Sequence, residues 1–322
     1  MTGVQTCALP ILRKVEIIGY GYYVPENIVE FDGQIRHRVP EGGSDTQLSM
    51  AVSAAKAALE KASLDIADID CIVSASAVGV QPIPCTAALI HEQIAKGTDI
   101  PAMDINTTCT SFVSAFDYVS YLIDAGRYSR VLLVASEKAS VGLNPKQKES
   151  FELFGDGAAA VVLSRCGSGE SGVIFGKQAT WSEGAHDTEI RGGLTGLYPD
   201  SYEAMPEEFC FDMNGLKVLK LAGRKLPKFF DSFLKESGYT MDDIDMVVPH
   251  QASKALGMIM PLLGVPKDKY IDIVPEYGNM VSVAIPHALI WAIENGKIKK
   301  GDTVLLIGTA AGLTANALLF KY

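Results

Sequence analysis

The sequence predicts an α/β fold built from two similar halves. Helical and strand patterns alternate along the whole chain, which is typical of this class. The acidic turn and apolar strand of DIDCIVSASA, beginning at Asp68, return as DIDMVVPHQA at Asp243. Hydrophobic residues make up 48% of the chain and charged residues 20%, as in ordinary α/β enzymes. We therefore expect a duplicated unit; the alternative is that D-I-D is only a common turn before a strand.

The first half predicts a helix, strands and a second helix in turn. Residues 45–62 carry apolar positions at helical spacing behind a candidate N-cap, Asp45. A buried strand follows in DIDCIVSASAV, and a helix is expected near Cys109. The apolar runs RVLLVASE at 130–137 and GAAAVVLSR at 157–165 have the length and composition of buried strands.

The second half predicts the same kinds of element. A long helix is expected over about 216–237, followed by the strand in DIDMVVPHQA. A helix near 284–294 then precedes the strands in DTVLLIGTAAG and ANALLFKY. We place the two halves at residues 13–166 and 167–322.

The opening stretch, MTGVQTCALPI, fits neither a helix nor a strand pattern, and it lacks the basic and long apolar regions of a secretory signal. It resembles a translated sequencing-adapter scar. We expect residues 1–12 to be a non-native or disordered leader and folding to begin near Arg13.

Composition excludes several classes of function. A formal net charge of −10 argues against a nucleic-acid-binding protein, which needs a basic surface. No apolar run is long enough to cross a bilayer. The six cysteines are scattered and form no C-x-x-C pair, so we expect no metal site and a cytoplasmic protein with reduced thiols.

Cys109 is the first candidate catalytic residue. Small hydroxyl residues surround it in NTTCTS, at the point where a helix is expected to begin. Unpaired N–H groups and the helix dipole at such a position favour a thiolate, the nucleophilic form of cysteine. The alternative is a buried structural cysteine.

His250 and Asn279 are the other two candidates. His250 follows a buried strand directly, and ligand sites in α/β sheets collect at the carboxyl ends of strands. The alternative is a histidine that caps a neighbouring helix. Asn279 lies in YGNMVSVA between an expected strand and a helix, where an Asn after Gly is also an ordinary turn residue.

Two further motifs are rich in small residues. GTAAGLTANAL at 308–318 is compatible with close approach of the backbone to a ligand. FGDGAAAVVL at 154–163 is expected to be a tight turn that enters a strand.

Together these motifs resemble the ketoacyl-synthase III branch of the thiolase-fold condensing enzymes, over nearly the whole chain from about Lys14. Three catalytic motifs occur in the order and approximate spacing of that family. The matching stretches are TCTSF at 108–112, FGDGAAAVVL at 154–163, VPHQA at 248–252 and YGNMVSVAIP at 277–286.

The resemblance implies a thiolase-like duplicated αβαβα fold of five layers, and a homodimer. Cys109 would accept an acyl group from a thioester. His250 and Asn279 would hold the carbonyl of a malonyl-type or β-ketoacyl thioester during a decarboxylating Claisen condensation. The N–H groups of Cys109 and Ala311 would form the acyl oxyanion hole. Ile83 matches the position from which the partner subunit lines the acyl tunnel.

The resemblance also implies how acyl groups arrive. They would be delivered on the phosphopantetheine of acyl carrier protein or coenzyme A, with no other cofactor. Lys220 matches a carrier-contact position of the family, and Lys217 and Lys254 lie where they could assist. The family's Trp-containing loop, which embraces the adenine of coenzyme A, is replaced by the shorter EFDGQIRHRVPEGGSDTQ at 30–47. We expect delivery by a carrier protein, or weak binding of coenzyme A.

The expected function is therefore that of an acyltransferase-class ketosynthase in fatty-acid-related or secondary, polyketide-like metabolism. One alternative is an acyltransferase or thioesterase that passes the Cys109-bound acyl group to an alcohol, an amine or water. Another is a mainly structural subunit of a heteromeric condensing enzyme, which uses the apolar stretch MIMPLL at 258–263 to bind its partner.

Overall fold

The structure is a computed structural model that describes residues 12–322. The helices are α1 (Gln47–Ala62), α2 (Thr86–Ile94), α3 (Ser111–Asp124), α4 (Lys148–Phe151), α5 (Gly215–Ser237), α6 (Leu256–Leu262), α7 (Val274–Tyr277) and α8 (Ala284–Glu294). The strands are β1 (Val15–Tyr23), β2 (Ile28–Phe31), β3 (Gln34–His37), β4 (Cys71–Ser74), β5 (Ala102–Asp104), β6 (Arg130–Glu137), β7 (Gly157–Arg165), β8 (Gly172–Thr180), β9 (Thr188–Glu189), β10 (Asp212–Met213), β11 (Met246–Pro249), β12 (Thr303–Ala310) and β13 (Thr314–Lys321).

Two large sheets repeat one pattern of strand pairing. In the first sheet, with the order β1-β7-β6-β4-β5, β4 is parallel to β6, β7 is antiparallel to β6, and β1 is antiparallel to β7. In the second sheet, with the order β11-β12-β13-β8, β11 is parallel to β12, β13 is antiparallel to β12, and β8 is antiparallel to β13. The predicted duplication is therefore confirmed. The strands of the first sheet come from residues before 166 and those of the second from residues after 170.

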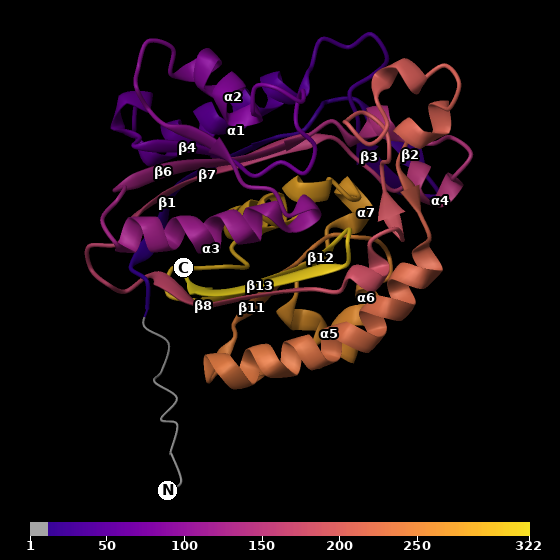
Figure 1. The fold of residues 1–322 in the computed structure, drawn as a ribbon. Helices are drawn as coiled ribbons and strands as arrows, with labels where there is room; N and C mark the ends of the chain where they lie inside the picture. Colours follow the sequence, from indigo (N-terminus) through magenta and orange to yellow (C-terminus); the bar gives the residue numbers. More distant parts are fainter. Residues whose placement is uncertain (1–11) are drawn as a thin grey trace, which may run out of the picture.

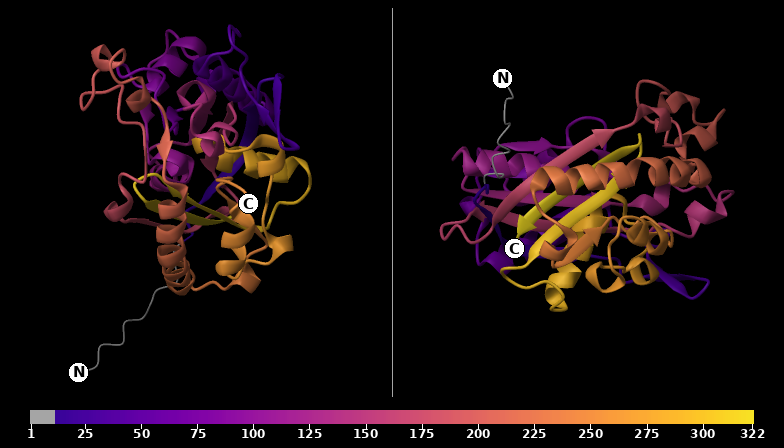
Figure 2. Two further views of the ribbon diagram at one scale, coloured as in Figure 1. Left: turned by 90° about the vertical axis from the view of Figure 1, so that its right-hand side faces the viewer. Right: turned by 90° about the horizontal axis from the view of Figure 1, so that it is seen from below.

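Helices and sheets alternate in five layers, as the family resemblance implies (Figure 1). Helices α1 and α2 cover the outer face of the first sheet, α3 and α8 lie between the sheets, and α5 and α6 cover the outer face of the second. Seen from below, α5 crosses the strands of the second sheet (Figure 2). Both faces of β12 are buried: Val304 and Leu306 face the central layer, whereas Leu305 and Ile307 face α5 and α6.

The repeated D-I-D turns form equivalent hydrogen bonds to the neighbouring parallel strand in both halves. The Asp70 carboxylate accepts a hydrogen bond from the Arg130 N–H at 2.9 Å, which ties β4 to β6. The Asp245 carboxylate accepts one from the Thr303 N–H at 2.7 Å, which ties β11 to β12. In each half the aspartate N–H also donates to the carbonyl of the same neighbour. The turn motif therefore sets the register of the parallel pair.

The N-cap expected for the first helix is wrong by one residue. Helix α1 is capped by Thr46, whose side chain accepts from the Ser49 N–H while the Ser49 hydroxyl accepts from the Thr46 N–H. Asp45 instead accepts a hydrogen bond from the Tyr23 hydroxyl at 2.8 Å. The reciprocal box satisfies two helix-end N–H groups, which one aspartate would not do here.

The described chain is fixed to the fold from Arg13 onward. Arg13 pairs its backbone with Val173 of the second sheet, and its guanidinium bonds the Asp117 carboxylate at 2.6 Å. Residues 1–11, most of the expected leader, lie outside the described residues, so that expectation stays a prediction. Within residues 12–322, no helix combines the length and the apolar character needed to span a membrane.

Glycines in β1 allow α1 to lie directly on the first sheet. A Cβ added at Gly21 would come within 2.5 Å of the Ala57 side chain and 2.7 Å of the Ala58 nitrogen. One added at Gly19 would come within 2.3 Å of the Ala58 carbonyl oxygen. Close packing of this kind cannot absorb an extra methyl group without a shift of the helix.

We predict that Gly21→Ala lowers the free energy of unfolding by about 1–3 kcal/mol, because the new methyl group overlaps the α1 backbone. Gly223→Ala in α5 is the matched control, since an added Cβ there meets nothing within 4 Å. It should raise the free energy of unfolding by about 0.5–1 kcal/mol through helix propensity. Urea titration of the three proteins measures both changes. A neutral Gly21→Ala would contradict the packing described here.

Candidate active site

Cys109 lies in a short 3-10 turn, η2 (Thr108–Thr110), immediately before α3. Thr108 has a φ of 51°, a left-handed conformation that is strained for a β-branched residue. Its N–H donates to the Asn106 side chain at 2.8 Å, and the Ser111 hydroxyl donates to its carbonyl at 2.6 Å. The strained turn is therefore held from both sides, and it places Cys109 just ahead of the helix rather than inside it.

The turn of Cys109 is anchored to the second half of the chain. The buried Asn316 amide of β13 donates to the Thr110 hydroxyl at 2.6 Å. Gly308 of β12 lies between the two halves: a Cβ there would come within 2.8 Å of the His250 Cβ and 3.1 Å of the Thr110 Cγ2. Only a residue without a side chain lets the cysteine turn and His250 approach this closely.

His250 follows β11 at its carboxyl end, and its N–H donates to the Ile307 carbonyl at 2.8 Å. The residue is 5% exposed, and its Nδ1 has no partner among the described residues. It therefore caps no helix. Burial lowers the pKa of His250 to about 4, so the ring is neutral at pH 7 and carries one N–H.

Asn279 is held by the FGDG segment. Its N–H donates to the Leu153 carbonyl at 3.0 Å, and its carbonyl accepts from the Gly155 N–H at 3.0 Å. A Cβ at Gly155 would come within 2.6 Å of the Tyr277 carbonyl oxygen, so only glycine fits. FGDG is thus more than the tight turn we expected. The element before Asn279 is the short helix α7 rather than a strand.

The Asn279 side chain has a defined orientation. Its Oδ1 accepts a hydrogen bond from the Val281 N–H at 2.8 Å, which fixes the amide flip. Its Nδ2 donates to the Ala252 carbonyl at 3.2 Å, two residues after His250. One of the two Nδ2 hydrogens is used there, so the other is free to donate.

The small-residue turn between β12 and β13 brings Ala311 to the sulfur. The N–H groups of Ala311 and of Cys109 itself both face the Cys109 sulfur and favour its anion. The structure thus brings Cys109, Ala311, His250 and Asn279 into one region through the contacts of Gly308 and Ala252.

The expectation of a resting thiolate is wrong. Burial, with a smaller contribution from the negative charge of Glu137, raises the pKa of Cys109 to about 12 despite the two N–H groups. The residue as a whole is only partly buried. The sequence indicated only that the helix end would stabilise the thiolate. The cost of burying a charge in packed surroundings is larger and raises the pKa of the thiol.

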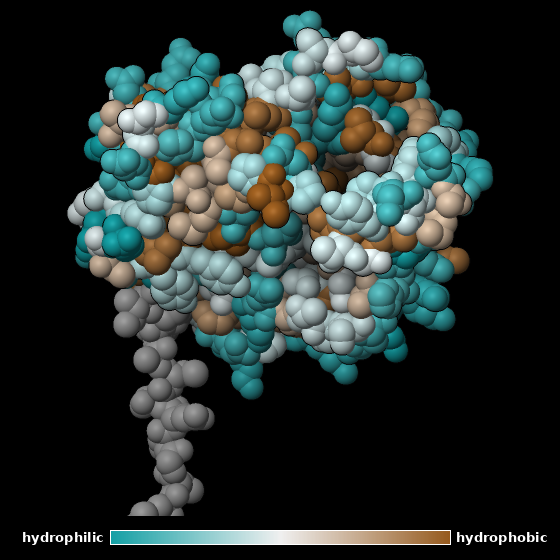
Figure 3. Space-filling model, turned by 45° about the horizontal axis from the view of Figure 1, so that its top comes forward, coloured by the Kyte–Doolittle hydropathy of each residue, from teal (hydrophilic) through white to brown (hydrophobic). Residues whose placement is uncertain are grey.

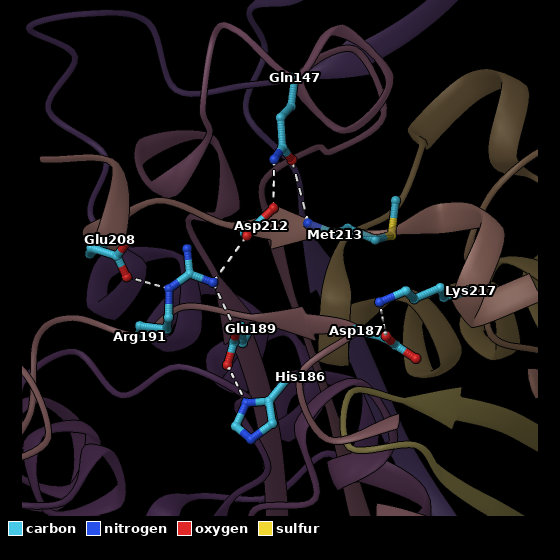
Figure 4. Close-up of polar contacts among 9 residues, drawn as sticks. All are labelled: Gln147, His186, Asp187, Glu189, Arg191, Glu208, Asp212, Met213 and Lys217. Atoms are coloured by element: carbon cyan, nitrogen blue, oxygen red, sulfur yellow. Dashed lines mark hydrogen bonds and ion pairs between the residues drawn. The ribbon is translucent and has the colours of Figure 1, made fainter. Parts of the chain in front are cut away.

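The remaining candidate residues lie on the surface. Ile83, in the loop between β4 and α2, is 85% exposed. Lys217 and Lys220 lie exposed in the first turns of α5, and Lys254 is exposed between β11 and α6. Lys217 lies 3.8 Å from the Asp187 carboxylate (Figure 4).

A long excursion, residues 182–214, connects β8 to α5. Arg191 at its centre forms ion pairs with Glu189 at 2.7 Å, with Asp212 at 3.0 Å and with Glu208, and these raise its pKa (Figure 4). Gln147 donates to Asp212 at 2.6 Å, so the excursion is joined to the segment before α4.

The excursion also reaches the site. Phe211 packs edge-on against Phe154 of the FGDG segment, with ring centroids 4.8 Å apart, and Phe154 is bridged to Asn279. Exposed apolar side chains, among them Leu194 and Leu216, lie on the excursion and at the start of α5. Figure 3 shows a hollow bordered by hydrophobic side chains on this side of the molecule.

Sequence reasoning did not predict the roles of several residues that build the site. Gly308, Asn316 and the strained Thr108 lie in the motifs singled out at 308–318 and 108–112, but their contacts were not predicted. A Gly within the apolar run of β12 was the available signal for Gly308. The buried Glu137 was not predicted at all. Among residues 12–322, no group of three or more His, Cys, Asp or Glu is arranged to hold a metal ion.

The segments that match known protein families contain Cys109, His250 and Asn279. The family model described as 3-Oxoacyl-[acyl-carrier-protein (ACP)] synthase III matches residues 103–181, and its C-terminal counterpart matches residues 234–322. The chain is 31% identical over 330 residues to the β-ketoacyl-[acyl-carrier-protein] synthase III of Clostridium perfringens, covering 96% of this chain and 100% of that one. It is 32% identical over 327 residues to synthase III 1 of Bacillus cereus, covering 96% and 99%.

A solved structure agrees with these matches. The crystal structure of 3-oxoacyl-[acyl-carrier-protein] synthase III from Aquifex aeolicus VF5 superposes with a TM-score of 0.84 at 28% identity, covering 96% of this chain and 100% of that one. Fold and comparisons together define a thiolase-fold condensing enzyme of the acyltransferase class. Within that class, the chain belongs to the 3-oxoacyl-[acyl-carrier-protein] synthase III family.

His287 of α8 lies beneath the Asn279 segment in an aromatic cluster. Its ring is fully buried, 4.4 Å from the Tyr277 ring and 4.7 Å from the Tyr22 ring, and neither nitrogen has a partner among the described residues. Burial, aided by nearby His37, lowers the pKa of His287 to about 3. The protonated ring is therefore excluded from the folded protein at neutral pH.

This burial predicts a pH-dependent stability. The unfolded chain binds a proton at His287 below about pH 6.5 and the folded chain does not, so the folded state loses about 1.4 kcal/mol per pH unit as pH falls below that value. We predict that His287→Leu removes about 2 kcal/mol of the loss in unfolding free energy between pH 7 and pH 5. Urea titration at both pH values measures it. Equal losses in the two proteins would contradict a neutral, buried His287.

Proposed function

We propose that this protein forms a carbon–carbon bond between two acyl thioesters, with Cys109 as the nucleophile. The observation that carries the proposal is the meeting of the two halves at Gly308. There the Thr110 side chain of the cysteine turn and the His250 Cβ both lie against Gly308, while the Asn279 amide donates to the Ala252 carbonyl, two residues after His250. The sequence places these groups far apart, and the duplicated fold joins them.

The first step is acyl transfer. The Cys109 sulfur attacks the carbonyl carbon of a thioester, and the bond from that carbon to the carrier sulfur breaks. The carrier leaves as a thiol with the proton that Cys109 gives up. The N–H groups of Cys109 and Ala311, which already face the sulfur, lie where they can donate to the oxyanion that develops beside it.

The second step is decarboxylating condensation. A malonyl-type thioester is the second substrate: the bond to its carboxylate breaks and carbon dioxide leaves. A β-ketoacyl thioester, the other extender considered, would instead lose the proton between its two carbonyl groups to water. The electron pair forms an enolate, whose oxygen accepts hydrogen bonds from the neutral His250 ring and the free Asn279 hydrogen. The enolate carbon then attacks the acyl carbon and releases the Cys109 sulfur, which regains a proton. Donors held in a dry site stabilise such an anion strongly.

Carrier-bound thioesters are the substrates we propose, in fatty-acid-related or polyketide-like metabolism. The names of the relatives support acyl carrier protein as the donor. The hairpin β2–β3 replaces the family's adenine-binding loop and contains no Trp, which supports a carrier over coenzyme A. Lys217, Lys220 and Lys254 are exposed and available to an acidic carrier.

A homodimer is also part of the proposal. In it, Ile83 of one protomer would line the acyl tunnel of its partner, and its 85% exposure in the single chain supports that role. The free cysteines of the described chain fit the cytoplasmic setting that we propose. No further cofactor is part of the proposal.

The two half-reactions should fail separately. We predict that Cys109→Ala abolishes acylation, measured by intact mass after incubation with acyl thioesters, without changing the thermal transition. His250→Ala should still acylate but lose condensation by about 10²–10³-fold, because one enolate donor is removed. Carbon dioxide release from a malonyl thioester, dependent on acylated enzyme, measures the second step. Acyl transfer to water or an amine without carbon dioxide release would favour the acyltransferase alternative.

Carrier delivery gives a second prediction. Lys220→Glu should raise the KM for an acyl carrier protein substrate by about fivefold or more at low salt, because a favourable charge pair becomes repulsive. The KM for acyl-coenzyme A should change much less. Lys235→Glu, exposed in the last turn of α5, is the control and should leave the carrier KM near that of the wild type. Equal effects at both positions would remove Lys220 from the docking site.

A further inference from the structure

Glu137 is a buried carboxyl group next to the site. It is the last residue of β6 and is 1% exposed. Among the ion pairs of residues 12–322, none includes Glu137. Burial raises its pKa to about 7. Burial of a carboxyl group without a neighbouring cation costs free energy, so the presence of Glu137 at this position needs an explanation.

Hydrogen bonds join Glu137 to two loops from different halves. Its Oε1 accepts from the Ser282 hydroxyl at 2.5 Å and from the Ala77 N–H at 2.5 Å. The N–H groups of Val78 and Ser282 also stabilise its anion. Ala77 and Val78 begin the loop that leads to Ile83, while Ser282 lies in the 3-10 turn η9 (Val281–Val283) after Asn279.

The hydrogen bond between Ser282 and Glu137 lies next to the turn that orients the Asn279 side chain. Val281, between the two, has a φ of 53°, a strained conformation for a β-branched residue. Its N–H is the donor that fixes the Asn279 amide. Such strain persists only where surrounding contacts enforce it. The hydrogen bond from Ser282 to Glu137 is the side-chain contact that holds the far end of this strained turn.

We propose that Glu137 is a positioning residue for condensation: by holding Ser282 it keeps the strained Val281 turn, and hence the Asn279 amide, directed at the enolate. The assignment rests on the proposed function for its chemistry, but its geometry stands on the contacts of Glu137 alone. Acyl transfer to Cys109 does not use Asn279, so the two half-reactions depend on Glu137 differently.

The same carboxylate acts on Cys109 in the opposite sense. Its negative charge helps raise the pKa of the thiol. His250, which lies across Gly308 from the cysteine turn, is neutral. A neutral residue at position 137 should therefore make the sulfur more reactive while it loosens Asn279. A general loss of structure would slow both steps together.

Glu137→Gln is the first test. The amide can still accept from Ser282, but its NH₂ group would face backbone N–H donors where the second carboxylate oxygen lies. Condensation, followed by carbon dioxide release, should fall on the order of tenfold or more. Alkylation of Cys109 by iodoacetamide at pH 8, followed by peptide mass, should be about threefold faster, with its pH profile moved to lower pH. Glu137→Asp should keep the charge and restore part of the condensation rate.

Ser282→Ala separates the two effects. It removes the hydroxyl and leaves the Glu137 charge, so condensation should fall while Cys109 alkylation stays at the wild-type rate. Hydrogen exchange at the Val281 amide should speed up in both variants. Glu60→Gln, on the exposed face of α1, is the control and should change none of these readouts.

The outcomes are distinguishable. Condensation within twofold of wild type in both Glu137→Gln and Ser282→Ala would overturn the proposal, as would equal losses of alkylation and condensation. If the wild-type protein acylates but condenses no extender, the proposed function fails instead. Alkylation and hydrogen exchange would then still decide whether Glu137 holds the Val281 turn.

Discussion

The site depends on the close approach of the two halves at Gly308. A side chain at this position would separate the cysteine turn from His250, since a single added carbon would already lie 2.8 Å from the His250 Cβ. The Asn316 amide holds the same junction through Thr110. In the proposed mechanism each half supplies part of the chemistry, so neither half would contain a working site by itself, and the duplicated fold would be required for more than stability.

Strain and burial gather at this junction. Two of the left-handed, non-glycine residues in the described chain, Thr108 and Val281, stand beside Cys109 and Asn279. Each donates its backbone N–H to the side chain of the asparagine two residues earlier, Asn106 or Asn279. Conformations of this kind cost about 1–3 kcal/mol each and persist at functional sites. The backbone thus places the nucleophile and the amide in positions that an unstrained turn would not reach.

The fold could be predicted from the sequence, whereas the catalytic roles of Cys109, His250 and Asn279 stay predictions. Alternating periodicity and the repeated D-I-D turn predicted an α/β class with a duplicated unit, because local pattern and strand burial are properties of short segments. The five layers were implied only by the family resemblance. The protonation of Cys109 was not predictable, since it depends on packing by distant residues. Glu137 was hidden for the same reason: at the end of an apolar strand it resembles an ordinary exposed terminus, and only the fold buries it. The predicted N-cap of α1 was wrong by one residue because Thr46 and Asp45 are both good capping residues.

Burial has opposite consequences for the two half-reactions, and this explains the balance of the site. It makes the Cys109 thiolate costly and so would slow the first attack in the proposed mechanism. It also keeps His250 neutral and strengthens its hydrogen bond, together with that of Asn279, to an enolate formed beside them. An enolate in water is quickly protonated, whereas a sulfur needs only a transient loss of its proton. A site dry enough to protect the carbanion is therefore better suited to carbon–carbon bond formation than one that maximises the reactivity of the cysteine.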